Sequence, residues 1–417
     1  MARRTLSEIY VIGAGIIGVT TALALQDRGH RVRLVDRKGV CAEASRGNAG
    51  AFAFADIAPL ATPGSLRKAP GWLLDPLGPL SLRPSHAVRM LPWLLRFFRA
   101  SHPSRHAAAV AAQASLMQLS AAALNRLITR TRAEPLIRRE GQLQLYEGAA
   151  EFAAAQAGWA LRRQHGVAFD LLDHPGAIAE VQPGLSPRFT HAGFTPGWIN
   201  TTDPALWTDH LARVFVQAGG VIEVLDVRAL HPLIEGVALT CATGTREAGH
   251  VVIAAGAWSH RLSATVGDRV PLDTERGYNT TFPTASFDLR THLTFGNHGF
   301  VVSRIGNGLR VGGAVELGGL TLPPNYRRAE VLLRKAVAFL PGLDPQGGTR
   351  WMGFRPSLSD SLPVIARATG SDRVIHAFGQ GHLGLTQAAA TAELVAALIA
   401  GQTPAMSLAP FDVRRFA

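Results

Sequence analysis

Three glycines near the start of the chain have the spacing of a phosphate-binding turn. Gly13, Gly15 and Gly18 follow an apolar, β-prone run and precede a segment rich in alanine and leucine. The first permits a tight turn, the second lets backbone N–H groups approach a pyrophosphate, and the third lets the helix pack on the strand. Asp36, about 20 residues on, stands where its carboxylate can accept ribose hydroxyls. The pattern predicts a dinucleotide site at a helix N-terminus, comprising Gly13, Ala14, Gly15, Ile16, Ile17, Gly18, Asp36 and Arg37.

Three later segments indicate which dinucleotide binds, because the glycine pattern serves NAD, NADP and FAD alike. They are Ser45-Arg46-Gly47-Asn48-Ala49-Gly50, Ala255-Gly256-Ala257-Trp258 at the end of a predicted strand, and Phe378-Gly379-Gln380-Gly381-His382-Leu383-Gly384. At these points the sequence resembles the FAD-dependent D-amino acid oxidase superfamily. It is most similar to bacterial D-amino acid dehydrogenases and their D-hydroxyproline dehydrogenase relatives, and the resemblance runs from end to end.

The resemblance implies further FAD contacts. In that family the first segment lies along the pyrophosphate and isoalloxazine, the backbone at the position of Val227 meets the adenine, and the C-terminal glycine loop approaches the flavin ring. A helix N-terminus there would supply positive potential to the reduced ring. Relatives with covalent flavin attach it through a cysteine or a histidine in these stretches. Neither cysteine of this chain falls in the C-terminal loop and no histidine lies between Ser45 and Gly50, so the resemblance implies non-covalent FAD. The implied contacts are Ser45, Arg46, Gly47, Asn48, Ala49, Gly50, Val227, Ala255, Gly256, Trp258, Gly353, Gly381, His382, Leu383, Gly384, Leu385 and Thr386.

A substrate clamp is predicted at Arg355. The segment Gly353-Phe354-Arg355-Pro356 resembles the family's Gly-Leu-Arg-Pro, whose arginine grips the carboxylate of the amino acid. A planar guanidinium suits this task, because it can bind a carboxylate with two hydrogen bonds and stays charged in a partly dry site. The alternative is that Arg355 pairs with Asp360 to hold a turn.

Three other residues are candidates for the catalytic pocket. Tyr278 matches a strand that reaches the active site in dehydrogenase relatives, although a buried tyrosine bonded to the backbone is the alternative. Phe300 stands where family members often have a tyrosine, which leaves His298 or Tyr278 to substitute. His298 or His382 could tune the proton on the substrate amine, and either could instead be a packed or solvated histidine.

The resemblance implies oxidation of a small D-amino acid, with D-hydroxyproline and D-proline as candidates. A hydride would pass from Cα to flavin N5, and the electrons would go on to a quinone or another acceptor. One alternative is an oxidase of glycine, sarcosine or another secondary amine. Oxygen-using relatives often hold a lysine by the flavin, and Lys38, Lys68 and Lys335 all lie outside the matched segments. Another alternative is a flavin-binding, non-catalytic subunit of a larger dehydrogenase.

Composition narrows the partners. The net charge of +12 comes almost entirely from dispersed arginines without a basic run or nucleic-acid motif, so we expect no nucleic-acid partner. Two cysteines, Cys41 and Cys241, fit a reducing compartment and a cytoplasmic location. We expect no metal site, because His102 and His106 have Pro103 between them and no third ligand. The start, Met1 to Gly18, resembles a signal peptide only superficially, since Glu8 interrupts its apolar run.

The elements that must position these residues predict an α+β fold. A strand–glycine turn–helix–strand unit opens the chain as part of a parallel, Rossmann-like sheet. Helices are expected over 151–164, 204–217, 328–339 and 386–400, helices broken at Pro92 and Pro103 within 86–132, a strand at 142–146 and an antiparallel sheet from 278 to 315. Residues 59–84 read as irregular. We assign 1–85, 195–270 and 350–417 to the FAD-binding domain, and 86–194 and 271–349 to the substrate domain.

The stretch 89–105 mixes apolar and aromatic residues with arginines. Such a basic amphipathic helix can lie on an anionic membrane, which would place the protein on the cytoplasmic face of the inner membrane, near a quinone. A helix docked on the protein body is the alternative. No apolar run approaches the ~20 residues of a membrane span, so we expect at most peripheral contact.

Overall fold

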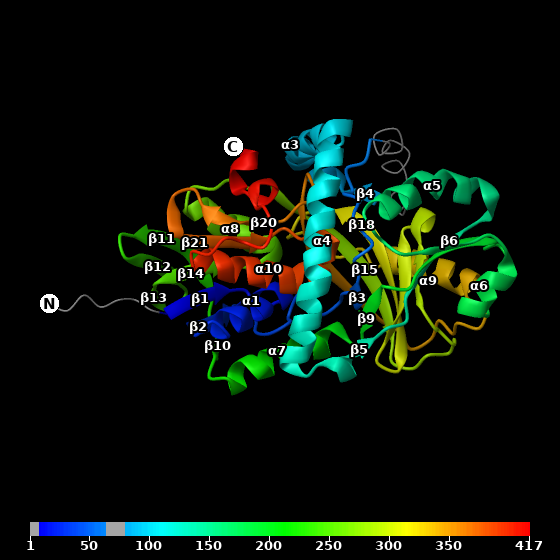
Figure 1. Cartoon of the computed structure of the whole chain (residues 1–417), viewed down its shortest axis with the longest axis horizontal. Coiled ribbons are helices and arrows are strands. Elements are labelled where there is room, and N and C mark those ends of the chain that lie inside the picture. The colour runs from blue at the N-terminus through cyan, green and yellow to red at the C-terminus, as the bar shows by residue number, and fades with distance from the viewer. Residues whose placement is uncertain (1–7, 64–79) are drawn as a thin grey trace.

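Two large β-sheets stand side by side in the computed structural model, which describes residues 8–63 and 80–417 (Figure 1). The first has the order β10-β2-β1-β14-β21-β20, and only the edge strand β20 is antiparallel to its neighbour. Its strands are β1 (Glu8–Ile12), β2 (Arg31–Asp36), β10 (Val221–Val224), β14 (His250–Ile253), β20 (Val364–Ala368) and β21 (Ser371–Phe378). The central strands are apolar because both faces of the sheet are covered.

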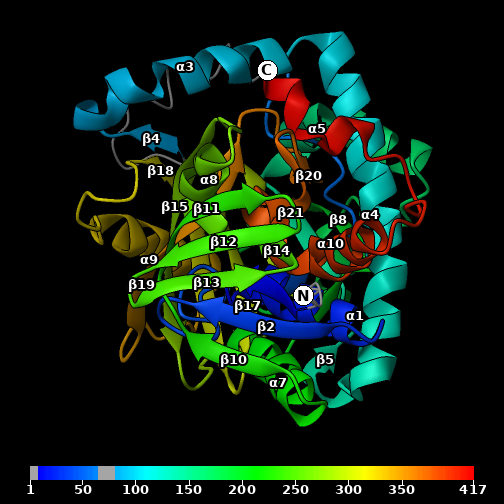
Figure 2. The same cartoon turned by 90° about the vertical axis from the view of Figure 1, so that its left-hand side faces the viewer.

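Helices cover one face of this parallel sheet and a small sheet covers the other. The helices are α1 (Ile16–Gln26), α7 (Pro204–Gln217) and α10 (Gly384–Ile399). The opposite face carries β11 (Val227–Leu233), β12 (Gly236–Cys241), β13 (Gly244–Ala248) and α8 (Ser259–Thr265), and the three strands lie in front of the parallel sheet in Figure 2. This arrangement places the N-terminus of α1 at the carboxyl edge of the parallel strands, where ligands of such sheets bind.

The second large sheet is mostly antiparallel. Its main path runs β19-β15-β18-β17-β16-β6-β8-β7, and β4 pairs with β18. The strands are β4 (Leu80–Leu82), β6 (Gln142–Tyr146), β7 (Asp170–Leu172), β8 (His191–Thr195), β15 (Leu272–Phe282), β16 (His292–Phe295), β17 (Phe300–Ile305), β18 (Gly308–Leu317) and β19 (Thr349–Leu358). Its helices are α5 (Gly148–Gln164), α6 (Pro175–Val181) and α9 (Arg327–Phe339). A third sheet joins β3 (Ala51–Phe52), β9 (Ile199–Thr201) and β5 (Ile137–Arg138).

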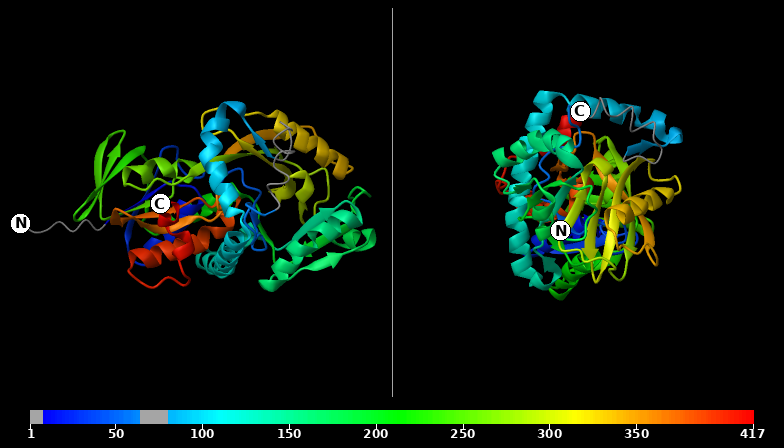
Figure 3. Two further views of the ribbon diagram at one scale, coloured as in Figure 1. Left: turned by 90° about the horizontal axis from the view of Figure 1, so that it is seen from above. Right: turned by 90° about the vertical axis from the view of Figure 1, so that its right-hand side faces the viewer.

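Two helices span the junction between the sheets. From above, α3 (Pro84–Ala100) and α4 (Pro103–Thr131) lie between the two ends of the molecule (Figure 3). Among the described residues, α4 and the segment Gly381–Ile399 have the length and apolar composition of a membrane span. Both have a packing explanation: α10 is mostly buried against α1, and α4 packs along α10. Helix α4 therefore joins the half of the molecule that contains the parallel sheet to the rest of the fold.

The predicted α+β class is confirmed, and most predicted elements lie within two residues of the observed bounds. One prediction was wrong: α3 continues through Pro92 instead of breaking there. Proline removes one backbone hydrogen bond, to the carbonyl of Val88, and the Val88 position is 86% exposed, so water can satisfy that carbonyl. Of the irregular stretch predicted at 59–84, residues 64–79 lie outside the described residues, as do residues 1–7 of the signal-like start.

The sheets do not follow the predicted domain boundaries everywhere. β4 precedes residue 86 and all but the first residue of β19 follows residue 349, yet both strands pair within the large antiparallel sheet. Conversely, α4 packs on α10 although residues 86–132 were assigned to the substrate domain. Strand pairing between β15 and β19 is long-range, so sequence order alone did not reveal it. The boundaries themselves stay a prediction.

Candidate active site

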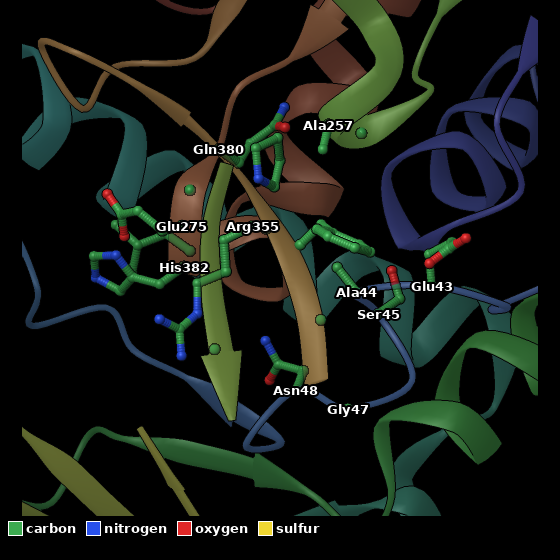
Figure 4. A pocket seen from close by; sticks show the side chains of 18 of the residues that line it. Glu43, Ala44, Ser45, Gly47, Asn48, Ala257, Glu275, Arg355, Gln380 and His382 are labelled. Carbon is green, nitrogen blue, oxygen red and sulfur yellow. The ribbon is translucent and has the colours of Figure 1, made fainter. Parts of the chain in front are cut away.

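A large cavity lies between the two sheets. Its volume is about 1350 Å³, which exceeds the 300–1,000 Å³ of a typical small-ligand site and suits a dinucleotide with a second small molecule. Figure 4 shows part of its wall, with Glu43 and Ser45 on one side and Glu275, Arg355 and His382 together on the other. Twenty of the residues predicted to bind the cofactor line it, and only Ala14, Gly18, Arg46, Gly50 and Thr386 lie behind its surface.

The glycine turn leaves room only for backbone. Gly13 has φ +109°, and a Cβ there would lie 2.3 Å from the Ala254 carbonyl oxygen. A Cβ on Gly18 would lie 1.7 Å from the Gly13 oxygen, so this glycine sets the close packing of α1 on β1. Gly15 caps α1 with no side-chain partner, and it lines the cavity. Backbone N–H groups at the start of a helix lack partners within the helix, so a pyrophosphate fits this turn.

The next part of the cavity fits an adenosine. Asp36 accepts the Ala14 N–H at 2.9 Å through one oxygen and the Lys38 N–H at 2.7 Å through the other. These bonds fix its carboxylate at the cavity wall, where ribose hydroxyls can donate to the remaining lone pairs. Arg37 stacks on the Trp258 ring at 3.9 Å, and Val227 lines the same end. The residues present therefore fit FAD from its adenosine to its pyrophosphate.

The segment 45–50 is tied to both halves of the molecule. Ser45 Oγ accepts the Ile16 N–H at 3.0 Å, which joins this segment to the start of α1. From the second sheet, Asn279 donates to the Gly47 carbonyl at 3.0 Å and Arg310 donates to the Asn48 carbonyl. Arg310 is buried, and burial lowers the pKa of its guanidinium. This segment is consequently held at a fixed distance from the substrate side of the cavity.

The C-terminal glycine loop closes the cavity from the opposite side. Gly381 has φ +55°, and the loop leads directly into α10. Thr386 Oγ1 accepts the Ala53 N–H at 2.9 Å, so Thr386 anchors the loop without lining the cavity. His382 faces the cavity, and desolvation at the cavity wall is the largest cause of its lowered pKa; Asp56 and Glu275 act in the opposite direction, and Arg355 adds a smaller lowering effect. His382 is therefore held in its neutral form at neutral pH.

Arg355 points into the cavity, where a ligand carboxylate can reach it. Its Nη1 donates to the Ala314 carbonyl at 3.0 Å, and the guanidinium lies over Gly277, where a Cβ would be 2.3 Å from Nη2. Burial lowers the pKa of Arg355 from its ordinary value, and the nearby Glu275 opposes that effect. The proposed alternative partner, Asp360, is bonded to Arg415 instead. No hydrogen bond to another described residue engages the remaining guanidinium N–H groups, so they can hold an anion.

The side chains of two predicted catalytic residues bind other groups of the protein. Tyr278 is in the cavity wall, but its hydroxyl donates to Glu316 at 2.6 Å and accepts the Asn325 N–H at 3.0 Å. Burial raises its pKa to about 12. His298 does not line the cavity: its Nε2 contacts Glu147 at 2.8 Å and its ring packs on Phe339. The interpretation of these two side chains as substrate contacts is corrected, because strand alternation and a short turn direct them away.

Sequence reasoning missed several residues of the cavity. Glu275, Asn279 and Arg310 lie on β15 and β18, and all three line the cavity. His292, on β16, is buried, and burial lowers its pKa to about 4. The sequence feature that could have identified these residues is a charged or polar residue within an otherwise apolar strand. No cysteine lines the cavity in the part of the chain that is described, and residues 8–63 and 80–417 hold no cluster suited to a metal.

Comparisons with known proteins agree on the family of proteins to which this chain is similar. The family model described as FAD dependent oxidoreductase (DAO) matches residues 8–398. The chain is 34% identical to a D-amino-acid oxidase of Bradyrhizobium diazoefficiens over 98% of this chain and 99% of that protein. It is 29% identical to a D-amino acid dehydrogenase of Allorhizobium ampelinum, with 98% and 99% covered. A glycine oxidase structure from Geobacillus kaustophilus superposes with a TM-score of 0.77 at 23% identity, covering 97% of each chain.

Proposed function

The chain belongs to the family of FAD-dependent oxidoreductases, and from that membership we propose that it is a dehydrogenase of a small D-amino acid. D-Proline and D-hydroxyproline are the candidates that the sequence favours. The observation that carries the proposal is the guanidinium of Arg355, half-buried and aimed into the cavity that fits FAD. Relatives described as D-amino-acid oxidase and D-amino acid dehydrogenase support an amino acid as the substrate.

In this proposal Arg355 orients the substrate. Its fork would bind the substrate carboxylate with two hydrogen bonds, and its bond to the Ala314 carbonyl fixes the fork in advance. FAD, when bound, supplies the acceptor for the hydride from Cα. The apolar walls of the cavity exclude water around the reacting carbon, which strengthens the carboxylate–guanidinium contact. The resulting imine then hydrolyses to a 2-oxo acid, or persists as a cyclic imine when the substrate is a proline.

Two features of the cavity support a dehydrogenase as the first candidate. Among the described residues, no lysine lines the cavity. Apolar side chains of α3 form part of the cavity wall. Oxidase action on glycine, sarcosine or another secondary amine is the second candidate, because one of the reported relatives is a D-amino-acid oxidase and a similar structure is a glycine oxidase. The two differ in their acceptor, which a direct assay separates.

We propose a membrane quinone as the acceptor, reached through α3. Leu95 and Phe98 line the cavity and are also 56% and 54% exposed at the outer surface. Val88 and Leu91 extend this apolar stripe, and Arg89, Arg96 and Arg99 flank it without any acidic residue in the helix. A stripe of this kind suits the surface of an anionic membrane, on the cytoplasmic face of the inner membrane. A lipid-soluble acceptor would then meet the same wall as the substrate.

One experiment tests the substrate and the acceptor together. The purified protein is mixed anaerobically with L- and D-amino acids, including both isomers of proline and hydroxyproline, and the visible flavin absorption is followed. Bleaching by D-forms alone supports the proposal. Reoxidation by a quinone without peroxide formation identifies a dehydrogenase, whereas rapid peroxide formation identifies an oxidase. A flavin that no amino acid reduces would refute the proposal that the purified single chain is an amino acid dehydrogenase.

A further inference from the structure

We propose that Glu275 binds the amino group of the substrate whose carboxylate binds Arg355, so that the site selects amino acids as zwitterions. This inference rests on the proposed function and assigns a second substrate contact to the same cavity. Glu275 would be the residue that distinguishes an amino acid from a 2-hydroxy acid or a simple carboxylic acid. The proposal follows from strand register, burial and the missing partner of this carboxylate.

Strand register places the two charges on one face. Glu275 on β15 is directly opposite Arg355 on β19 in an antiparallel pair. Side chains of such partners point to the same face of the sheet and lie side by side. Gly277 and Asn279, two and four residues on, line the cavity with Glu275. Figure 4 shows Glu275, Arg355 and His382 gathered at one side of the cavity.

Glu275 is buried without a protein partner. It is 5% exposed, and neither a hydrogen bond nor an ion pair joins its side chain to any other described residue. A buried carboxylate is costly unless a cation or several donors satisfy it. A ligand cation would satisfy it, and the α-ammonium of an amino acid is the cation that Arg355 would bring nearest.

Arg355 is kept from serving as that partner. Its Nη1 is bound to the Ala314 carbonyl, and its guanidinium rests over Gly277, which has no Cβ to displace it. No ion pair within 4.0 Å therefore joins Arg355 and Glu275, although they are cross-strand neighbours. The gap between them has opposite charges on its two sides. An α-amino acid carries a carboxylate and an ammonium on one carbon and matches such a gap.

The other charged groups near Glu275 are already accounted for. His382 has a lowered pKa from burial and is neutral at neutral pH. Asp56, which also lines the cavity, lies 3.7 Å from Arg162. The strand neighbour Arg276 points to the opposite face and lies 3.5 Å from Glu316. None of these groups bonds to Glu275, and Arg355 acts on it only through space, so a direct cationic partner is left for the ligand.

A pair of achiral ligands tests the contact on the FAD-loaded protein. 2-Aminoisobutyrate has an amino group but no hydrogen on Cα, so it binds without being oxidised; isobutyrate is the same acid without the amine. Their dissociation constants are measured by calorimetry for the wild type and Glu275→Gln. We expect the wild type to prefer 2-aminoisobutyrate by about tenfold or more, and Glu275→Gln to lose that preference, because a hydrogen bond between charged groups is lost.

Matched variants separate this role from a structural one. Glu147→Gln removes a carboxylate outside the cavity and should keep the preference. Arg355→Lys should weaken both ligands, since both carry the carboxylate. Should Glu275→Gln fail to retain FAD, Glu275→Asp carries the test, and its preference must fall below that of the wild type. A preference unchanged in the Glu275 variant overturns the inference while the proposed function stands; a wild type that binds neither ligand refutes both.

The pH dependence of kcat gives a second readout. A carboxylate beside the bound ammonium raises the pKa of that ammonium, and the amine must lose its proton to water before hydride leaves Cα. Removing the charge in Glu275→Gln lowers that pKa, so the acidic limb of the kcat profile shifts to lower pH while KM rises. A role in folding alone would leave the limb in place. An unmoved limb with an unchanged KM would count against the contact.

Discussion

Arg415 Nε donates to Asp360 at 2.7 Å, and a second nitrogen of the same guanidinium lies 3.5 Å from the other Asp360 oxygen. Arg415 belongs to the last turn of the chain, and it also donates to the Leu362 carbonyl at 2.6 Å. The turn after β19 is therefore held by a distant arginine. Arg355, five residues before Asp360, is left available to the cavity.

Replacing Arg355 by alanine is expected to remove the carboxylate contact. The kcat/KM for the best D-amino acid should fall about 100-fold or more, because two charge-assisted hydrogen bonds are lost. Arg355→Lys keeps the charge without the planar fork, so its kcat/KM should lie between that of the wild type and that of Arg355→Ala. Steady-state kinetics with an artificial electron acceptor measure both variants.

The matched control is Asp360→Asn. It weakens the pair with Arg415 and should lower the melting temperature while the KM stays near that of the wild type. If Asp360→Asn raised KM as strongly as Arg355→Ala, the clamp would have to be shared, and the assignment to Arg355 alone would be wrong.

Gly13→Ala should abolish FAD binding. The new Cβ would meet the Ala254 carbonyl oxygen at 2.3 Å, and φ at this position is +109°, which alanine rarely adopts. The turn must then move, and the backbone N–H groups move with it. The ratio of flavin to protein absorbance measures the loss. Gly197→Ala, where no atom lies within 4 Å of the new Cβ, should keep a full complement of flavin.

Local patterns made the cofactor half predictable. The glycine turn, Asp36 and the strands around them are close in sequence, and the physical requirement for glycine at Gly13 and Gly18 is visible in their spacing. The helix 204–217 and the strand 142–146 have the predicted bounds, because proline, glycine and period-two alternation mark their ends. Sequence patterns are sufficient to predict a site whose geometry depends on one turn, helix or strand.

The substrate side depended on register, which the sequence does not display. Tyr278 and Glu275 are three residues apart on one strand, so their side chains point to opposite faces of the sheet. Which face meets the cavity follows from the pairing of β15 with β19, which lies about 70 residues further along the chain. His298 was misplaced for a similar reason, since its short turn carries the ring toward Glu147 and Phe339.

Acid should destabilise the protein partly through His292. Burial lowers its pKa to about 4 from an ordinary value near 6.5, so below pH 6.5 the unfolded chain binds a proton that the folded protein does not. Stability therefore falls as pH decreases through this window. Between pH 7 and pH 5 the wild type should lose about 2 kcal/mol more than His292→Gln. Urea unfolding of both proteins at both pH values, in excess FAD, tests this; equal losses would contradict it.

The apolar stripe on α3 should bind anionic membranes. Leu91 and Leu95 are each 56% exposed on a helix whose only charged residues are arginines, so the double variant Leu91→Glu/Leu95→Glu removes apolar area and adds repulsion. Sedimentation with vesicles should show binding of the wild type to anionic lipid, weaker binding to neutral lipid, and release in about 1 M salt, where the screening length falls to about 3 Å. Leu206→Glu, at a position 52% exposed on α7, should bind as the wild type does.

Because Leu95 also lines the cavity, reduction of a lipid-soluble quinone should decline in the double variant more than reduction of a water-soluble dye. Equal losses with both acceptors would place the defect at the flavin and refute entry of the quinone beside α3.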